Sequence, residues 1–310
     1  MTTTPALIVQ EVSLRDGLQI EPVFVPTQHK IALANAFTAL GFSRIEISSF
    51  VSPKAVPALA DAGEVFASID RGADATYVAL VPNLIGAERA LAANADELNM
   101  VASASRTHNL ANMRMTPAQS FAEFERIAAV GAHRASLNGT VATAFGCPFE
   151  GAQAPGKVLD FVRRYLDLGC SGITLADTTG MANPRQVRAL VEQVLALVDP
   201  RGLTLHFHNT RGLGLANVIA AHEAGARRFD ASLGGLGGCP FAPGASGNIC
   251  TEDLVAMCEE MGIATGLDLP ALIHLSRRLP GLVGHETSGQ VAKAGRVADL
   301  HPAPEGLRAA

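Results

Sequence analysis

The stretch Pro184–His208, PRQVRALVEQVLALVDPRGLTLHFH, contains one complete helix followed by one complete strand. Asn183 and Pro184 mark the helix start, because asparagine caps a first turn well and proline suits the first helical position. Apolar residues recur at helical spacing as far as Val198, which predicts an amphipathic helix with one buried face. A short turn then leads into Leu203–His208, whose apolar residues predict a buried strand. The stretch is therefore one step of an α/β fold.

The same alternation of strand and helix runs along most of the chain. Eight strand-then-helix units without a large insertion predict an α/β protein with a closed (β/α)8 barrel, the TIM barrel, and leave an open doubly wound sheet as the alternative. The predicted strands are Ala6–Val12, Arg44–Ser48, Ala75–Val81, Glu97–Val101, Ser136–Ala142, Gly172–Ala176, Leu203–His208 and Arg228–Leu233. The predicted helices are Thr27–Leu40, Pro53–Ile69, Ile85–Ala93, Pro117–Gly131, Pro155–Leu168, Pro184–Val198, Leu213–Ala224 and Glu252–Met261.

The C-terminal part of the chain does not continue this repeat. Residues 263–300 instead predict additional C-terminal helices at Leu269–Leu279 and Glu286–Ala294, packed on the barrel and followed by a tail at 301–310. No linker rich in Pro, Gly or Ser is long enough to separate two domains. We therefore expect residues 1–310 to form a single domain.

Composition narrows the class of protein. The chain has 310 residues, is 48% hydrophobic and carries a formal net charge of −5, so a large core is available and general binding to nucleic acid is disfavoured. No apolar run reaches the roughly 18 residues of a membrane span, and neither end carries a recognisable signal, transit or lipidation motif. The five cysteines are odd in number and lack C-x-x-C spacing, which favours reduced thiols. We expect a cytoplasmic protein without a membrane or nucleic-acid partner.

Two histidines share one face of a predicted strand. In an extended strand alternate side chains point the same way, so His206 and His208 project side by side while Leu205 and Phe207 point to the other face. Two buried imidazoles are costly unless something binds them. A divalent metal is the usual solution, with Asp16 as the carboxylate that joins them, and a pair of hydrogen-bonded core histidines is the alternative.

Further polar residues follow the other predicted strands. In a barrel of this kind, function gathers at the carboxyl ends of the strands, so side chains far apart in sequence would converge on one mouth. The residues that fit this rule are Arg15, Asp16, Glu46, Ser48, Ser49, Asp177, His206, His208 and Asn248.

The predicted metal ligands are Asp16, His206, His208 and Asn248. Two nitrogen and two oxygen ligands leave further positions for substrate or water, which suits Mg²⁺ or Mn²⁺ and poorly suits a closed structural zinc site. Asn209 points to the opposite face of the strand and receives no ligand role.

Two carboxylates and two cysteines accompany this set. Glu46 and Asp177 would orient a histidine or the substrate, and an ordinary ion pair or cap is the alternative. Cys239 lies within GGLGGCPFAPGASGN, a glycine-rich loop, where a thiol on a moving lid can deliver a proton; a passive small residue in a turn is the alternative. Cys147 in FGCPFEG would line the mouth, with a structural role favoured over a catalytic one.

Several motifs together carry a family resemblance. The chain resembles the 3-hydroxy-3-methylglutaryl-CoA lyase family of the DRE-TIM metallolyase superfamily, and the Cys-bearing glycine loop separates such lyases from the related condensing synthases. The matching motifs are RDGLQ at Arg15–Gln19, IEISSFVSPKAVP at Ile45–Pro57, AFGCPFEG at Ala144–Gly151, ADTTG at Ala176–Gly180, HFHNTRG at His206–Gly212, and the glycine loop followed by TEDLV.

The resemblance implies a retro-Claisen cleavage of a 3-hydroxyacyl-CoA to acetyl-CoA and a keto acid, here acetoacetate, and a place in leucine degradation. It implies the same four metal ligands and an acyl-CoA substrate. Asp16 or His206 would act as base, Arg15 would stabilise the enolate on the thioester oxygen, and Cys239 would protonate it. Besides Glu46 as a catalytic residue, it implies substrate-binding positions at Gln19, Ser48, Ser49, Asn138, Thr140, Cys147 and Asp177.

The chain also departs from the family pattern. HFHNTRG has Asn209 and Arg211 where the family pattern is HxHDT-Y-G, and better-known members carry an Arg and an aromatic residue where this chain has Asn138 and Thr140. Because we expect both to face the substrate, the acyl group stays open and citramalyl-CoA is an alternative. The segment 103–114 also differs. It predicts a polar loop, in which CoA phosphate binding by Arg106, His108 and Arg114 is the less favoured interpretation.

Three other functions use the same scaffold. A condensing synthase and a pyruvate-dependent class II aldolase share the barrel and the metal, and a silent metabolite-binding barrel would lose the general acid. The presence of both Arg15 and Cys239 counts against the last. We also expect a homo-oligomer.

Overall fold

Eight parallel strands close into a barrel in the computed structural model, which describes residues 6–238 and 247–302. The strands are β1 (Ile8–Glu11), β2 (Arg44–Ser49), β3 (Thr76–Leu80), β4 (Glu97–Ser103), β5 (Ser136–Ala142), β8 (Gly172–Asp177), β9 (Leu203–Phe207) and β10 (Arg228–Ala231). Around the barrel they follow the order β1, β10, β9, β8, β5, β4, β3, β2, and β1 pairs with β2 to close it. The predicted TIM barrel is confirmed, and the open sheet is excluded.

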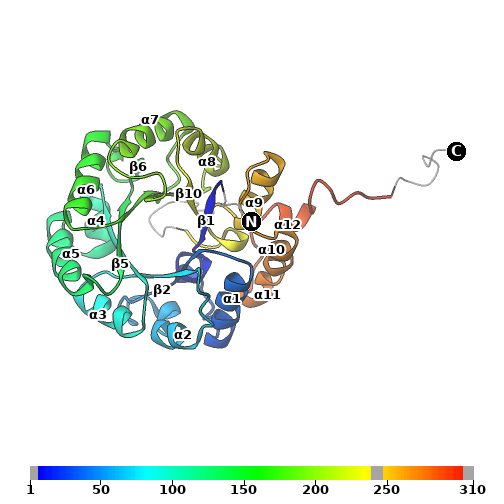
Figure 1. The fold of residues 1–310 in the computed structure, drawn as a ribbon, viewed down its shortest axis with the longest axis horizontal. Coiled ribbons are helices and arrows are strands. Elements are labelled where there is room, and N and C mark those ends of the chain that lie inside the picture. The colour runs from blue at the N-terminus through cyan, green and yellow to red at the C-terminus, as the bar shows by residue number, and fades with distance from the viewer. Residues whose placement is uncertain (1–5, 239–246, 303–310) are drawn as a thin grey trace.

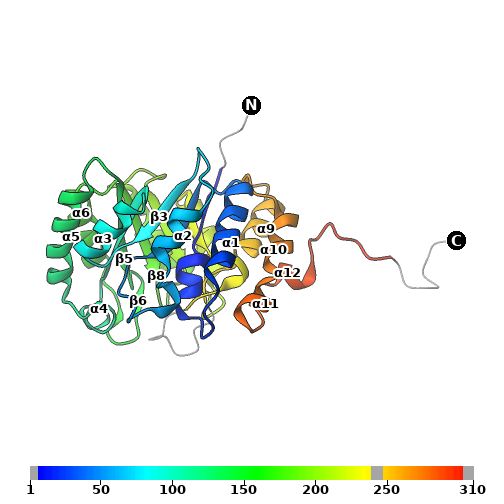
Figure 2. The same cartoon turned by 90° about the horizontal axis from the view of Figure 1, so that it is seen from below.

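Helices surround this barrel as a ring (Figure 1). In α7 the predicted apolar stripe is buried against the strands, and the Asn183 side chain accepts a hydrogen bond from the backbone N–H of Gln186, as expected of an N-cap. The helices of the ring are α1 (Thr27–Ala39), α2 (Ala62–Ser68), α3 (Leu84–Ala92), α5 (Pro117–Gly131), α6 (Pro155–Asp167), α7 (Pro184–Leu195), α8 (Gly214–Glu223) and α9 (Thr251–Glu260). A further helix, α4 (Arg106–Met113), lies at one end of the ring (Figure 2).

The predicted long second helix, Pro53–Ile69, is wrong. Only a 3-10 turn at Pro57–Leu59 and the short α2 form there. Val56 precedes Pro57, and proline disfavours the helical conformation in the residue before it; Val56 has φ −133°. The chain therefore runs irregularly from β2 to Pro57 before a helix can start.

The predicted polar loop after the fourth strand is also wrong, because α4 occupies it. The Ser105 side chain caps α4 by accepting from the backbone N–H of His108. Asn109 is buried, and its amide accepts from the N–H of Ser103 and donates to the carbonyl of Met115. The buried polar residues of this segment thus bond within the structure, while Arg106 and Arg114 are exposed. A small hairpin, β6 (Gly146–Cys147) with β7 (Gly151–Ala152), was not predicted either.

The C-terminal helices are shorter than predicted. They are α10 (Leu269–Ser276), α11 (Leu279–Val283) and α12 (Val291–Ala294). All three lie on the side of the barrel that carries α9 and α1, and the segment after α12 runs away from the barrel in both views (Figures 1 and 2). Within the described ranges, no helix is long and apolar enough to cross a membrane.

The barrel interior is polar at its N-terminal end. Arg44 of β2 contacts Glu97 of β4, and its Nε donates to Oε1 of Gln10 in β1 at 2.8 Å. Strands β2 and β4 are not neighbours, so the Arg44–Glu97 pair must cross the interior. Arg44 and Glu97 are the first residues of their strands, so the pair fills the interior at the N-terminal ends of the strands. The carboxyl ends of the strands are therefore the place for a site.

Candidate metal centre and active site

The first predicted motif lies in a tight turn directly after β1. The carbonyl of Val12 accepts from the N–H groups of Arg15, Asp16 and Gly17, which makes Ser13–Gly17 a single π-helical turn. Glu11 anchors the base of this turn, since its carboxylate accepts from Ser13 N at 2.8 Å, Leu233 N at 3.1 Å and Thr251 Oγ1 at 2.6 Å. Burial raises the pKa of Glu11 to about 7. The turn is therefore tied to the base of the glycine loop.

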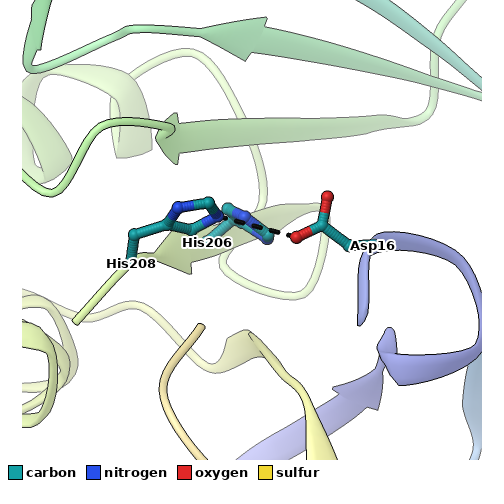
Figure 3. A group of neighbouring side chains, drawn as sticks. All are labelled: Asp16, His206 and His208. Atoms are coloured by element: carbon teal, nitrogen blue, oxygen red, sulfur yellow. Dashed lines mark ion pairs between the residues drawn. The ribbon is translucent and has the colours of Figure 1, made fainter. Parts of the chain in front are cut away.

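Three of the predicted ligands face one another at the mouth of the barrel. One ligand atom from each of Asp16, His206 and His208 lies within 4.8 Å of the others. Figure 3 shows the Asp16 carboxylate, from the turn after β1, directed at the two imidazoles of the β9 end. His208 Nε2 lies 3.6 Å from Asp16 Oδ2. The geometry brings together residues almost two hundred positions apart.

Asn248, the fourth predicted ligand, joins the same group. It pairs with His208 through an isolated β-bridge, and its Nδ2 donates to Asp16 Oδ2 at 2.7 Å and to the Leu236 carbonyl at 3.0 Å. Its Oδ1 is buried and has no hydrogen-bond partner in the described structure, an arrangement that a cation would relieve. Two imidazole nitrogens together with carboxylate and amide oxygens form a donor set that fits a divalent cation.

The protonation of Asp16 and His208 is compatible with metal binding. Burial alone would raise the pKa of Asp16, but the Arg15 guanidinium and the two imidazoles hold it well below its usual range. Burial lowers the pKa of His208, so that imidazole is neutral at physiological pH. An ionised carboxylate and a neutral imidazole are the forms in which these side chains bind metals.

His206 has a partner that the sequence did not reveal. Its Nδ1 lies 3.1 Å from Oδ2 of Asp230, which the register of β9 and β10 places beside it. Burial lowers the pKa of His206, but the Asp230 hydrogen bond and the Asp16 charge together raise it above its usual value. The sequence does contain a signal for this partner: Arg228, Asp230 and Ser232 alternate as polar residues in a strand expected to be buried, which indicates a polar face directed into the barrel.

Arg15 links the metal group to Glu46. Its Nε donates to Glu46 Oε2 at 2.6 Å and its NH1 to Asp16 Oδ1 at 2.7 Å. Burial lowers the pKa of Arg15, but the charges of Glu46 and Asp16 outweigh this effect and raise the pKa above its usual value. The guanidinium therefore stays charged. Burial raises the pKa of Glu46, against the lowering effect of Arg15 and of an Asn99 hydrogen bond. Glu46 thus orients an arginine rather than a histidine, which is the ion pair held as its alternative.

Asp177 caps the turn after β8. Its Oδ1 accepts from the N–H groups of Met181 at 2.8 Å and Ala182 at 3.1 Å, and its buried Oδ2 has no partner in the described structure. Burial raises the pKa of Asp177 to about 6. The observed contacts match the alternative interpretation as a cap, and substrate binding by Asp177 stays a prediction.

The remaining predicted site residues occupy varied positions. Ser48 and Ser49 are buried at the end of β2, and Gln19 is half-buried in the turn that follows Gly17. Cys147 is buried and its Sγ donates to Ser105 Oγ at 3.0 Å. Cys239 lies outside the described residues.

Asn138 and Thr140 are directed into the barrel, where they hydrogen-bond to Asn99. Both side chains are buried, and the bonds recorded for them are to protein groups. Their expected contact with substrate stays a prediction. Asn99 itself was not singled out from the sequence, because it interrupts the apolar pattern of a strand at only one position.

Comparison with known proteins identifies the family of the chain. The HMGL-like family model matches residues 6–279. The chain belongs to the HMGL-like family. It is 43% identical over 304 residues to (R)-citramalyl-CoA lyase of Chloroflexus aurantiacus, covering 94% of this chain and 96% of that protein. It is 42% identical over 278 residues to the hydroxymethylglutaryl-CoA lyase YngG of Bacillus subtilis, covering 89% and 93%.

A solved structure is more similar still. An HMG-CoA lyase from Acinetobacter baumannii, in complex with coenzyme A and 3-methylmalate, is 66% identical and has a TM-score of 0.95. The match covers 98% of this chain and all of that chain, 100%. The predicted family is confirmed.

Proposed function

We propose that this HMGL-like protein is a divalent-metal-dependent carbon–carbon lyase that cleaves 3-hydroxy-3-methylglutaryl-CoA to acetyl-CoA and acetoacetate. The observation that carries the proposal is the convergence of Asp16, His206, His208 and Asn248 beside the Arg15 guanidinium at the barrel mouth. The relatives named as hydroxymethylglutaryl-CoA lyases support the substrate.

The metal would be held by those four residues. When bound, Mg²⁺ or Mn²⁺ supplies a Lewis acid that lowers the pKa of the substrate's 3-hydroxyl. Asp16 or His206 would accept the hydroxyl proton. Loss of that proton allows the neighbouring carbon–carbon bond to break.

Arg15 would bind the thioester oxygen as negative charge develops on it. Its guanidinium is charged and fixed by Glu46 and Asp16, so little reorganisation is needed during the reaction. A preorganised donor of this type often lowers the activation free energy of the reaction by about 3–4 kcal/mol. Glu46 contributes by holding Arg15 in place.

Cys239 would protonate the enolate carbon, by resemblance to the family. The loop that bears it starts at Gly234, whose N–H donates to the buried Glu252 carboxylate at 3.0 Å, next to the Leu233 N–H held by Glu11. Two carboxylates therefore fix Leu233 and Gly234, where the loop starts. Gln19, Ser48, Ser49, Asn138, Thr140, Cys147 and Asp177 are proposed to surround the substrate.

A second candidate substrate is citramalyl-CoA. The relative that is 43% identical and named (R)-citramalyl-CoA lyase favours it. Both thioesters carry a hydroxyl on the carbon that is cleaved from the acetyl unit, so one set of residues serves either. A cytoplasmic location, a homo-oligomer and a place in leucine degradation belong to the same proposal and rest on sequence features and resemblance.

Product analysis separates the two substrates. Purified protein with Mg²⁺ or Mn²⁺ is incubated with 3-hydroxy-3-methylglutaryl-CoA and with citramalyl-CoA, each with and without a chelator. We expect chelator-sensitive acetyl-CoA together with acetoacetate from the first thioester. Acetyl-CoA with pyruvate, from the second thioester alone, would move the assignment to citramalyl-CoA. No acetyl-CoA from either would contradict the lyase proposal.

A further inference from the structure

Four polar side chains meet inside the barrel below the metal group, and we call them the interior polar cluster. They are Asn99 of β4, Asn138 and Thr140 of β5, and Thr174 of β8. Each is at most 7% exposed. The register places Asn99 beside Asn138 and Thr140 beside Thr174, so the cluster is a continuous strip across three neighbouring strands.

The hydrogen bonds of the cluster fix the orientation of one amide. Asn99 Oδ1 accepts from Asn138 Nδ2 at 3.0 Å and from Thr140 Oγ1 at 2.7 Å. A carbonyl oxygen has two lone pairs, so both are used. Turning the amide over would place its Oδ1 against the Glu46 carboxylate, which can only accept, and so favours the observed orientation of Asn99.

That orientation directs the Asn99 amide hydrogen across the barrel. Asn99 Nδ2 donates to Glu46 Oε1 at 2.9 Å, while the other oxygen, Glu46 Oε2, accepts from Arg15 Nε. Glu46 is 1% exposed, so water does not replace either donor. Each carboxylate oxygen has one directed partner, and the plane of the carboxylate is set from both sides.

We propose that Asn99 is a positioning residue, held by the interior polar cluster, which fixes Glu46 and thereby aims Arg15 at the reacting thioester. The inference rests on the proposed function, because that function gives Arg15 its role. The side-chain hydrogen bonds of Asn99 go to Glu46, Asn138 and Thr140, so it acts on the thioester through Glu46 and Arg15. Thr140 supports it directly, and Thr174 lies at the far end of the cluster.

Three variants test the chain of contacts. Asn99→Leu removes the donor to Glu46, Thr140→Val keeps Asn99 but frees one lone pair of its oxygen, and Thr174→Val is the matched control at the same depth. Since a misplacement of about 1 Å can cost about 100-fold in rate, we expect kcat to fall about 10- to 100-fold in Asn99→Leu. We expect a smaller fall in Thr140→Val, and Thr174→Val should lie within about 2-fold of the wild type. Mn²⁺ affinity should stay unchanged in all three, and KM should stay unchanged in Asn99→Leu and Thr174→Val.

A second readout needs neither substrate nor metal. In metal-free protein labelled with ¹⁵N at arginine Nε, the Arg15 Nε–H signal is assigned by its absence in Arg15→Lys. Its bond to Glu46 should shift it from the free-arginine position and slow its exchange with water. Asn99→Leu should move the signal towards the free position, Thr140→Val should move it less, and Thr174→Val should leave it in place.

The outcomes separate positioning from simple core packing. An Arg15 signal that is unchanged in Asn99→Leu would overturn the proposal, and so would equal losses of kcat in all three variants. A raised KM in Thr140→Val with an unchanged Arg15 signal would leave Thr140 with substrate binding alone and overturn its support of Asn99. If Asn99→Leu does not fold by circular dichroism, Thr140→Val decides by the same two readouts. Absence of lyase activity in the wild type would contradict the proposed function, while the Arg15 signal would still test the positioning.

Discussion

Asp230 hydrogen-bonds to His206, a proposed metal ligand, and is not itself in the proposed ligand set. It accepts at Nδ1 of His206, and the two residues lie side by side in β10 and β9. A carboxylate on one ring nitrogen fixes the tautomer and leaves the other nitrogen with its lone pair free for a metal. The ligand set at the barrel mouth therefore depends on a residue one strand away.

Asp230→Asn should weaken metal binding while leaving the fold intact. A neutral amide accepts more weakly from Nδ1–H, and loss of such a partner typically costs about 10- to 100-fold in affinity. Calorimetric titration of metal-free protein with Mn²⁺ measures the change. Asp61→Asn is the matched control, because Asp61 is half-buried and bonded to Lys30 and Thr27 rather than to a site residue; the Mn²⁺ affinity of this variant should equal that of the wild type. Equal affinities in Asp230→Asn and wild type would exclude the orienting role.

Asp177→Asn should change the pH dependence of stability. The pKa of Asp177 is raised in the folded state to about 6, from 3.8, so the folded protein binds more protons than the unfolded chain between those values. Wild-type stability should therefore fall, relative to Asp177→Asn, as pH rises from about 4 to about 6, by up to about 3 kcal/mol. Asn keeps an oxygen for the Met181 and Ala182 N–H groups, so the comparison isolates the charge. Urea unfolding of metal-free protein at several pH values measures it, and a constant difference would refute the raised pKa.

The packing of helix α6 against strand β5 depends on Gly139. A Cβ atom added to Gly139 would lie 2.2 Å from Cγ of Tyr165, a residue of α6 whose side chain is fully buried. Tyr165 is held there because its hydroxyl donates to the Thr140 carbonyl at 3.0 Å. The close approach of α6 to β5 thus requires a residue without a side chain.

Gly139→Ala should therefore destabilise the barrel. Overpacking of a fixed core costs about 1–3 kcal/mol, and the ring cannot move without breaking its hydrogen bond. Gly156→Ala, within α6 itself, is the control, since nothing lies within 4 Å of its added Cβ and alanine favours a helix. Urea denaturation should show a lower midpoint only in the first variant. A midpoint unchanged in Gly139→Ala would mean that α6 can shift.

Elements with a clear period were predictable, and those defined by local polar bonds were not. The helix α7 and the strand β9 follow from their apolar patterns and their caps. The helix α4 was missed because its buried polar residues, His108 and Asn109, have the composition of a loop. The helix expected at Pro53–Ile69 is too long, because Pro57 disfavours the helical conformation at Val56.

The predicted site converges at the scale of the whole molecule. The barrel rule correctly brought Asp16, His206, His208 and Asn248 to one mouth, because it depends only on strand order. Partners across the barrel, such as Asn99 with Glu46, depend on register and side-chain rotamers, which a single sequence does not specify. The roles of all these residues, and the single-domain organisation, remain predictions.

One measurement tests the central claim most directly: metal-free protein is titrated with Mn²⁺ while bound ion and acetyl-CoA release from 3-hydroxy-3-methylglutaryl-CoA are followed in the same samples. We predict that release rises in proportion to one bound ion per chain. His208→Ala should need far more Mn²⁺ for half-saturation while its unfolding free energy changes little, since His208 is a ligand in this scheme. Full release in the presence of chelator, or wild-type Mn²⁺ affinity in His208→Ala, would contradict a lyase that works through these four ligands.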